Sequence, residues 1–419
     1  MEEWKEYRLG EVTSILGDGI HGTPKYDDEG SIFFINGNNL ENGHIVIKDN
    51  TKRVSYEESL KHRKPLSERT ILVSINGTIG NVAKYNGEPC ILGKSACFFN
   101  VNESVDLNFI YYVVANNNFK NTITRLATGT TIKNVSLKTM REYSFMMPSL
   151  PTQQKIASIL SSLDDKIKVN RRINEQLEEL AQALFKSWFV DFEPFKDGEF
   201  VESELGMIPK GWKVDYISNI PHIIETGRRP KGGVGNIISG IPSIGAENIK
   251  GLGYYDYSKT KYVTEDFADK MKKGEIKGYE LLIYKDGGKP GYFIPNFSIF
   301  GEGFPFERMY LNEHVFKLDF FNRGFNAFAY FFFRTDIVMS YLNAQGGKAA
   351  IPGINQKDIE AIPILSMDNE YVKLFGNKVS KIIEKILINS KEILHLTTLR
   401  DTLLPKLMSG EIDVNEVEI

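Results

Sequence analysis

Side chains that could carry out catalysis are scattered through this chain of 419 residues. The stretch most similar to a phosphate-binding loop runs from Gly87 to Ser95, but Gly87 lies one residue too far from Gly93 and Pro89 removes a backbone donor. The sequence contains no G-x-S-x-G or H-E-x-x-H motif, and its six histidines are dispersed. We therefore predict neither a catalytic nor a metal site, and we do not expect the chain to be an enzyme.

Polar loops rich in glycine are the remaining candidates for a functional site. Each follows a short apolar segment that is typical of a β-strand ending in a turn. The loops occur in corresponding pairs, namely 17–24 with 226–230, 76–80 with 286–288, and 128–133 with 345–351. Asn39 likewise corresponds to Asn248. The pairs predict two tandem halves of related mixed α/β structure, whose loops differ either because they read different targets or because they drifted after a duplication.

A long helix is expected to follow the first half. From Pro151 to Phe192, apolar residues recur in steps of three and four, and only Asn170 and Asn174 interrupt the seam that they form. Such a helix would span roughly 57 Å and needs a partner along its apolar side. The acidic pairs Asp164-Asp165 and Glu178-Glu179 fall on its flank, where we expect solvated charge.

The partner helix is predicted in the same chain. The same seam returns between Glu370 and Leu407, with Asn389 in the place of Asn170 and with Gly376 and Pro405 near the expected ends. Two helices related by a pseudo-twofold axis must run antiparallel, although any two amphipathic helices align at some register. An arginine at a seam position, Arg400, predicts that the far end of the second helix splays or faces a partner.

Composition sets broad limits on the protein class. Hydrophobic residues make up 42% of the chain and aromatic residues 12%, which suits folded cores in two or three domains. There is no apolar run of membrane-spanning length, no signal peptide, and no cysteine beyond Cys90 and Cys97, so we expect a cytoplasmic protein without a disulfide framework. The net charge of −3 permits DNA binding without requiring it, because a neutral domain can carry a basic face.

Three segments carry a resemblance to a known family. They are PSLPTQQKIA from Pro148 to Ala157, LFKSWF from Leu184 to Phe189, and LRDTLLPKLMSGEI from Leu399 to Ile412. Together with the half-repeat, these segments resemble the specificity (S) subunit of type I restriction-modification systems, over nearly the whole chain. The resemblance implies an α/β (α+β) fold, with two tandem mixed α/β recognition domains separated by two long helices that pack as an antiparallel, pseudo-twofold symmetric coiled coil.

The resemblance also implies a domain plan and a function. We expect a first target-recognition domain at 1–150, a first spacer helix with an acidic linker at 151–209, a second recognition domain at 210–368, and a second spacer helix with a tail at 369–419. Each domain would read one half of a bipartite target in double-stranded DNA, while the helices set the spacing and dock two methyltransferase subunits. The cofactors S-adenosylmethionine, ATP and Mg are then expected on the methyltransferase and restriction/translocase subunits, and none in this chain.

Site residues follow from the chemistry of base reading. Arg and Lys suit guanine, and Asn or Gln suits adenine, while other loop donors contact phosphates. The candidates in the first domain are His21, Thr23, Lys25, Asn76, Thr78, Thr130, Thr131 and Lys133. Those in the second domain are Arg228, Arg229, Lys231, Lys285, Lys289, Gln345 and Lys348. Each could equally be a solvated loop residue.

The helices supply a further set of candidates. We expect Asn170 and Asn389 to meet across the pseudo-dyad and fix the register of the coiled coil. The candidates for subunit docking are Phe185, Trp188, Phe189, Leu399 and Leu407, and the alternative for these residues is packing against the chain's own recognition domains. The alternative to DNA recognition as a whole is a coiled-coil scaffold whose two globular heads bind proteins.

Overall fold

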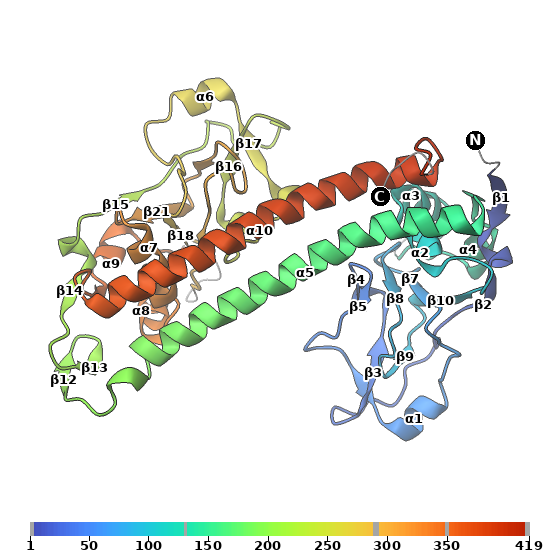
Figure 1. Ribbon diagram of the computed structural model, residues 1–419, viewed down its shortest axis with the longest axis horizontal. Helices are drawn as coiled ribbons and strands as arrows, with labels where there is room; N and C mark the ends of the chain where they lie inside the picture. Colours follow the sequence, from blue (N-terminus) through green and yellow to red (C-terminus); the bar gives the residue numbers. More distant parts are fainter. Residues whose placement is uncertain (1–3, 130–131, 288–292, 348–351, 415–419) are drawn as a thin grey trace. The chain divides into compact units, whose positions relative to one another are not determined.

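The computed structural model describes residues 4–129, 132–287, 293–347 and 352–414. The chain forms two compact units, here called unit 1 (residues 1–165 and 396–419) and unit 2 (residues 166–395). Two long helices, α5 (Leu150–Phe189) and α10 (Glu370–Met408), each contribute a segment to both units (Figure 1). The predicted mixed α/β fold with two long helices is confirmed.

The second long helix extends past both residues that were expected near its ends. Gly376 lies within α10, where an added Cβ would come within 2.5 Å of the carbonyl oxygen of Gly324. Glycine therefore allows the helix to approach the start of α7 (Arg323–Phe333) closely. Pro405 lies in the final turns of α10, where the helix continues to Met408 without a backbone donor at that position.

Unit 1 contains two main sheets and a set of short helices. An antiparallel four-stranded sheet has the order β2-β10-β7-β8, a three-stranded sheet has the order β6-β3-β9, and β1 pairs with β11. The strands are β1 (Lys5–Arg8), β2 (Thr13–Asp18), β3 (Ile32–Ile35), β4 (Leu40–Glu41), β5 (His44–Ile45), β6 (Arg53–Val54), β7 (Thr70–Ser74), β8 (Val82–Lys84), β9 (Cys90–Leu92), β10 (Ala96–Val101) and β11 (Ser144–Met147). The helices are α1 (Tyr56–Leu60), α2 (Leu107–Ala115), α3 (Asn117–Arg125) and α4 (Leu137–Glu142).

Unit 2 repeats this plan with the same strand order. Its four-stranded sheet is β15-β21-β18-β19, its three-stranded sheet is β17-β16-β20, and β14 pairs with β22. The strands are β14 (Val214–Tyr216), β15 (Ile223–Glu225), β16 (Ile241–Ile244), β17 (Lys261–Val263), β18 (Leu281–Tyr284), β19 (Phe297–Ile299), β20 (Tyr310–Leu311), β21 (Val315–Asp319) and β22 (Pro363–Leu365). The helices besides α7 are α6 (Glu265–Asp269), α8 (Asp336–Gly346) and α9 (Gln356–Glu360), and a hairpin of β12 (Phe200–Ser203) and β13 (Gly206–Pro209) precedes the repeat. The two α/β domains are therefore related element by element.

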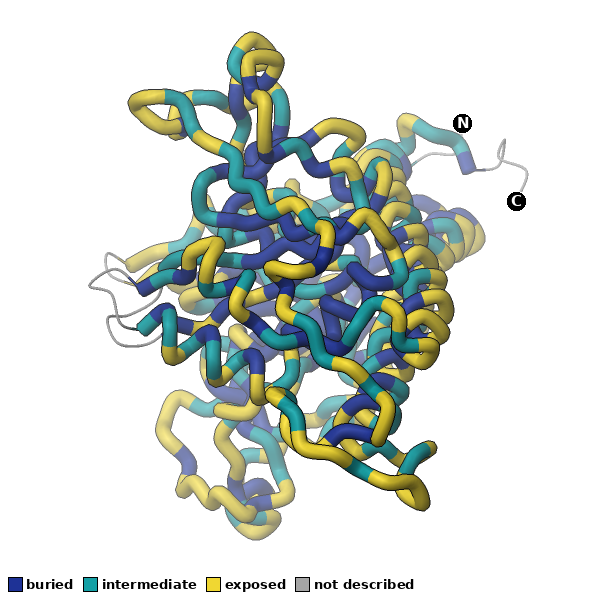
Figure 2. The backbone as a smooth tube through the Cα atoms, turned by 90° about the vertical axis from the view of Figure 1, so that its left-hand side faces the viewer, coloured by how far each residue is buried: buried dark blue, intermediate teal, exposed yellow. Residues whose placement is uncertain are grey.

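An aromatic core fills unit 2. The sequence of α7, RGFNAFAYFFF, is apolar nearly all round because the helix is buried on most sides. Phe328 and Phe331 of α7 contact both Phe185 of α5 and Phe375 of α10, with ring centroids 5.7 to 6.2 Å apart. Figure 2 shows the buried stretches gathered in the interior and the exposed loops around them.

The aromatic core corrects part of the docking prediction. Phe185 and Phe189 are 1% and 9% exposed and belong to the core of unit 2, and Leu407 is 2% exposed in the core of unit 1. The prediction that these three side chains dock another subunit is wrong, because their apolar surface is already covered by this chain. Trp188 is half-buried beside Tyr371, and Leu399 is 38% exposed, so these two residues keep surface that a partner could contact.

A polar layer lies between α5 and α10 in unit 2. Asn170 and Asn389 are 2% and 1% exposed, as their seam positions predict, but they do not pair with each other. The side-chain amide of Asn170 donates to Glu392 at 2.9 Å, and that of Asn389 donates to Asn174 at 2.9 Å. The expected meeting of Asn170 with Asn389 is therefore corrected, because the antiparallel register places Asn174, one turn further along α5, opposite Asn389.

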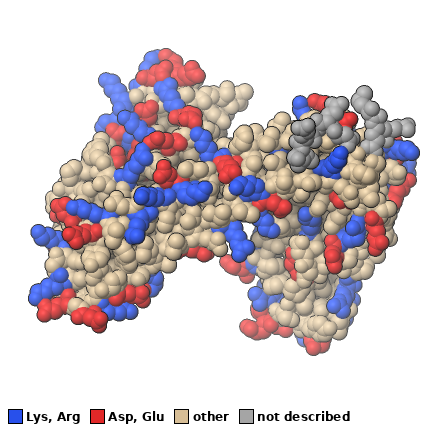
Figure 3. Space-filling view, in the orientation of Figure 1, with Lys and Arg blue, Asp and Glu red and all other residues tan. Residues whose placement is uncertain are grey.

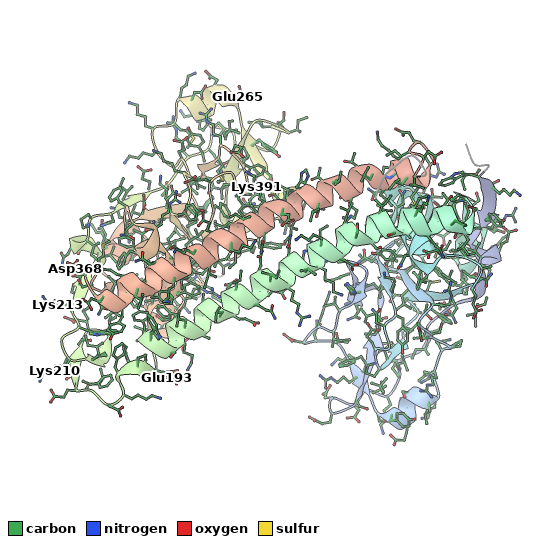
Figure 4. The ribbon with its side chains drawn as sticks, in the orientation of Figure 1. Glu193, Lys210, Lys213, Glu265, Asp368 and Lys391 are labelled. Atoms are coloured by element: carbon green, nitrogen blue, oxygen red, sulfur yellow. The ribbon has the colours of Figure 1, made fainter. Side chains whose placement is uncertain are left out.

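Charged residues of the same helices also make specific contacts. In unit 1, Arg400 donates to Asp164 at 2.7 Å, and Asp164 also accepts from Tyr112 of α2 at 2.7 Å. The end of α10 is thus held against α5, and the expected splaying is wrong. In unit 2, Glu178 accepts from Arg334 at 2.6 Å, so neither acidic pair is simply solvated. Lys391, labelled in Figure 4, leaves the helix interface and pairs with Glu307 at 3.0 Å.

Candidate nucleic-acid interface

The loops predicted to bind DNA in unit 1 meet at one edge of the four-stranded sheet. Strand β10 runs antiparallel to both of its neighbours and pairs Cys97 with Asp18 of β2 and Ala96 with Ser74 of β7. The ends of β2 and β7 and the start of β10 therefore share an edge. The loops that carry His21, Asn76 and Thr78 leave the sheet at this edge.

A third loop joins the same edge through the distant residues 133–135. The amide of Val135 donates to the carbonyl of Ile75 at 2.8 Å, and a bridge links Asn76 with Asn134. Gly77 also donates to the carbonyl of Lys133 at 3.4 Å. The structure thus brings the loops of the candidates Asn76, Thr78 and Lys133 together, while the candidates Thr130 and Thr131 lie outside the described residues.

A glycine fixes the first of these loops. A Cβ on Gly19 would lie 2.1 Å from the carbonyl oxygen of Leu92, so only glycine allows the loop to cross β9 this closely. His21 follows with its ring exposed and its Nε2 atom 2.8 Å from Asp18. Thr23 is also exposed. Lys25 is exposed but contacts another element, since its amide donates to Glu58 of α1 at 3.0 Å.

Unit 2 builds the corresponding edge from the same backbone contacts. Ile354 donates to the carbonyl of Lys285 at 2.7 Å, and a bridge links Asp286 with Gly353. A Cβ on Gly227 would lie 1.6 Å from the carbonyl oxygen of Leu311, the counterpart of Leu92. The two edges therefore share a framework, although their side chains differ.

A chain of paired side chains crosses the edge of unit 2. The guanidinium of Arg229 donates from Nε to Glu313 at 2.7 Å and lies 2.7 Å, through Nη2, from Nε2 of His314. The other ring nitrogen of His314 lies 2.5 Å from Asp286, which also accepts from Lys285 at 2.6 Å. We refer to these five residues as the Arg229 network. Because Nδ1 of His314 faces a carboxylate and Nε2 faces a guanidinium, the neutral tautomer with a proton on Nδ1 satisfies both contacts.

The electrostatics of the Arg229 network follow from these contacts. The hydrogen bond to Glu313 raises the pKa of Arg229 above its ordinary value. Burial alone would raise the pKa of Glu313, but the hydrogen bond and the positive charge of Arg229 lower it below the ordinary value. Both groups therefore stay ionised at neutral pH, and the guanidinium is held in a fixed orientation.

The other candidates of unit 2 lie in varied settings. Arg228 is exposed, donates to the carbonyl of Lys270 at 3.3 Å and sits 5.2 Å from the ring centroid of Phe267 in α6. Lys231 is exposed, and Gln345 is half-buried in α8. The candidates Lys289 and Lys348 lie outside the described residues.

Sequence reasoning did not select three members of the network as site residues, although one of them, Asp286, lies in a loop that it had singled out. His314 was treated as one of several dispersed histidines, and Glu313 was not considered, because both are far in sequence from Arg229. The segment of His314 corresponds to that of Ser95 in unit 1. The amide of Lys285 donates to the carbonyl of His314 at 3.1 Å, and the amide of Ile75 donates to the carbonyl of Ser95 at 2.9 Å. Extending the alignment of the halves to this segment would have placed Glu313 and His314 beside the predicted loops.

The surface shown in Figure 3 mixes Lys and Arg with Asp and Glu, without an extended basic region on this face.

The segment that resembled a phosphate loop contains strand β9. Within the ranges that the structure describes, no group of three His, Cys, Asp or Glu residues is arranged to hold a metal ion. No described helix combines the length and apolar character needed to cross a membrane.

Proteins that are similar to this chain include specificity subunits of type I restriction enzymes. Residues 1–179 match the family model described as type I restriction modification DNA specificity domain. The type I restriction enzyme MjaIX specificity subunit of Methanocaldococcus jannaschii is 27% identical, over 99% of this chain and 95% of its own length. The chain is thus similar to type I restriction enzyme specificity subunits over nearly its whole length. The HindI specificity subunit of Haemophilus influenzae is 25% identical over 98% of this chain and 100% of its own length.

A solved structure shares the fold of this chain. The S subunit of a type I restriction-modification system from M. genitalium superimposes with a TM-score of 0.60 at 17% identity, covering 97% of this chain and 96% of that one. The recognition made from the sequence is therefore confirmed.

Proposed function

We propose that each α/β domain of this chain reads one half of a bipartite target in double-stranded DNA. The observation that carries the proposal is the repeated sheet edge, at which the same framework presents different side chains in the two units. The proposed division is 1–150 and 210–368 for the recognition domains, and 151–209 and 369–419 for the spacer helices with their linker and tail. A shared framework with different edge residues suits two domains that read different base sequences.

We further propose that α5 and α10 set the distance between the two half-sites. The helices contain 40 and 39 residues, and the buried contact of Asn174 with Asn389 supports a single register, because sliding the helices would leave both amides unpaired. Half-site centres about one DNA turn apart, roughly 34 Å, are the expected spacing.

Base and phosphate contacts are proposed from the loops at the two edges. The proposed set in the first domain is His21, Thr23, Lys25, Asn76, Thr78, Thr130, Thr131 and Lys133. The proposed set in the second domain is Arg228, Arg229, Lys231, Lys285, Lys289, Gln345 and Lys348. Exposed lysines such as Lys133 and Lys231 suit phosphates, because an ammonium on a flexible stem acts as a point charge.

The chemistry of the complex is proposed to belong to its other subunits. Two methyltransferase subunits would bring S-adenosylmethionine, and restriction/translocase subunits would bring ATP and Mg, while this chain supplies recognition without catalysis. Trp188 and Leu399 support docking of such a subunit, because both keep exposed apolar surface on the long helices.

The test is base selection by the chain reconstituted with its methyltransferase subunits. A randomised duplex pool should yield a consensus with two separated parts. Arg228→Ala with Arg229→Ala should relax the consensus in one part only. The matched control is Arg308→Ala with Arg323→Ala, which removes the same charge from ion-paired arginines elsewhere in unit 2.

Two results would overturn the proposal. Equal loss of preference in both parts would contradict the division of labour between the domains. A complex without DNA affinity at low salt, where phosphate contacts are strongest, would instead favour a scaffold whose heads bind proteins.

A further inference from the structure

The Arg229 network is a feature of unit 2 alone. Gly19 and Gly227 hold matching places, and His21 and Arg229 each follow two residues later. The position that matches Glu313 is Lys94, which is exposed in unit 1. His21 instead pairs with Asp18 of its own loop. Because the framework forms in unit 1 without these ion pairs, the network is not needed to build the edge.

The guanidinium of Arg229 keeps donors that are unused. Nε and Nη2 are occupied by Glu313 and His314, whereas Nη1 has no partner among the described residues. The side chain is 28% exposed, so the two N–H groups of Nη1 can reach a ligand from a guanidinium that is already oriented. An arginine fixed in this way loses little side-chain entropy when it binds.

The neighbouring charges indicate what kind of acceptor Nη1 would meet. The carboxylates of Glu313 and Asp286 both belong to the network, and the charges of Arg229 and Lys285 offset them, so the network has no net charge. A phosphate brought to Nη1 would therefore meet no net positive charge, whereas the N7 and O6 atoms of guanine are neutral acceptors that suit an arginine donor. The setting therefore favours a base edge over the DNA backbone.

We propose that Arg229 reads a guanine in the half-site bound by the second domain, and that Glu313, His314 and Asp286 are positioning residues that orient its guanidinium. This inference rests on the proposed function, and it adds the identity of one base and the residues that secure its reading. Lys285 completes the set by neutralising Asp286 at 2.6 Å.

The experiment is base selection with single substitutions in the full complex. The wild-type consensus should contain a guanine in one part, and replacing that base should weaken binding roughly 5- to 150-fold. Arg229→Ala should abolish this preference and leave the other part of the consensus intact. Arg229→Lys should fail to restore it, because a lysine ammonium keeps the charge but cannot be held in one orientation by Glu313 and His314 while it donates to the base.

The positioning role of His314 is tested by comparing two substitutions at this position. His314→Leu should reduce the guanine preference, whereas His314→Gln, whose amide can accept from Arg229 and donate to Asp286, should retain much of it. Thermal unfolding of each variant checks that unit 2 is folded. Arg308→Ala, at an ion pair elsewhere in unit 2, should not change the preference at any base.

The outcomes separate the two proposals. A two-part consensus that Arg229→Ala leaves unchanged, or affinity that falls equally for all sequences, overturns the role of Arg229 while the proposed function stands. Rescue by Arg229→Lys would likewise overturn it, in favour of a simple charge effect. Failure of the wild-type complex to select any consensus contradicts the proposed function itself.

Discussion

The sheet edges of the two α/β domains differ in chemistry while sharing their backbone. The edge of unit 1 presents an imidazole, an amide, a hydroxyl and an ammonium, on His21, Asn76, Thr78 and Lys133. The edge of unit 2 presents the Arg229 network, in which each charge has a partner of opposite sign. Both edges depend on a glycine held against a carbonyl and on a bridge between two loops.

This difference teaches that framework and recognition are carried by separate residues. Matched substitutions at corresponding framework positions should destabilise the two units by the same amount. Substitutions at edge positions should change the recognition by one unit only. The predictions below test the framework side of that comparison, from the largest expected effect to the smallest.

The largest effect is expected at the two framework glycines. Gly19→Ala and Gly227→Ala should each destabilise their own unit by about 3 kcal/mol, because the new Cβ would overlap a backbone carbonyl oxygen. Hydrogen exchange resolved by segment would report the loss in each unit. Gly22→Ala and Gly235→Ala are matched controls, since an added Cβ meets nothing within 4 Å at either site. If only one of Gly19→Ala and Gly227→Ala were tolerated, the two edges would not share the same framework.

A smaller and unequal effect is expected at the matched asparagines. Asn39 accepts from Asn36 and donates to Val46 and Thr51, at 3.0 to 3.1 Å, whereas Asn248 accepts from Gly245 at 2.9 Å and its amide nitrogen has no partner in the described structure. Asn39→Ala should therefore cost about 2 kcal/mol and Asn248→Ala about 1 kcal/mol. Chemical denaturation of the two variants measures the difference, and a larger loss for Asn248→Ala would contradict it.

The smallest effect is expected where α5 is tied to each domain. Asp164 bonds to Arg400 and Tyr112, and Glu178 bonds to Arg334 and Tyr330. Asp164→Asn and Glu178→Gln should each cost about 1 kcal/mol, and less at high salt, because these pairs are only partly buried.

A control for the α5 contact in unit 1 is available on α10. Asp401 touches the same Arg400 but is 60% exposed, so Asp401→Asn should change the free energy of unfolding by less than Asp164→Asn does. Denaturation at two salt concentrations would show whether the order holds. An equal cost for both variants would mean that burial does not govern this pair.

The elements with strong periodicity could be predicted from the sequence. The apolar seam beginning at Pro151 predicted α5, which begins at Leu150, because each turn of a long amphipathic helix repeats the same signal. The loops at Asn76 and Lys285 could be found because a strand pattern that ends at glycine marks a turn.

The partners across the structure could not be predicted in the same way. The pairing of Asn389 with Asn174 depends on the register between two helices, and a shift of one turn preserves the apolar seam. The burial of Phe185 and Phe189 was missed because an aromatic helix face looks the same whether it packs on its own domain or on another protein. Glu313 was missed because its contact with Arg229 spans 84 positions of the chain.

The division of α10 between the units has a consequence for synthesis on the ribosome. Unit 2 is one continuous segment that ends at His395, whereas unit 1 combines the first 165 residues with those from Leu396 onward. Leu407 and Val414 are 2% exposed in the core of unit 1 and are translated after all of unit 2. Unit 1 therefore begins to be synthesised before unit 2 but completes its core after it, and Leu160 and its neighbours lack their α10 partners until unit 2 has been translated.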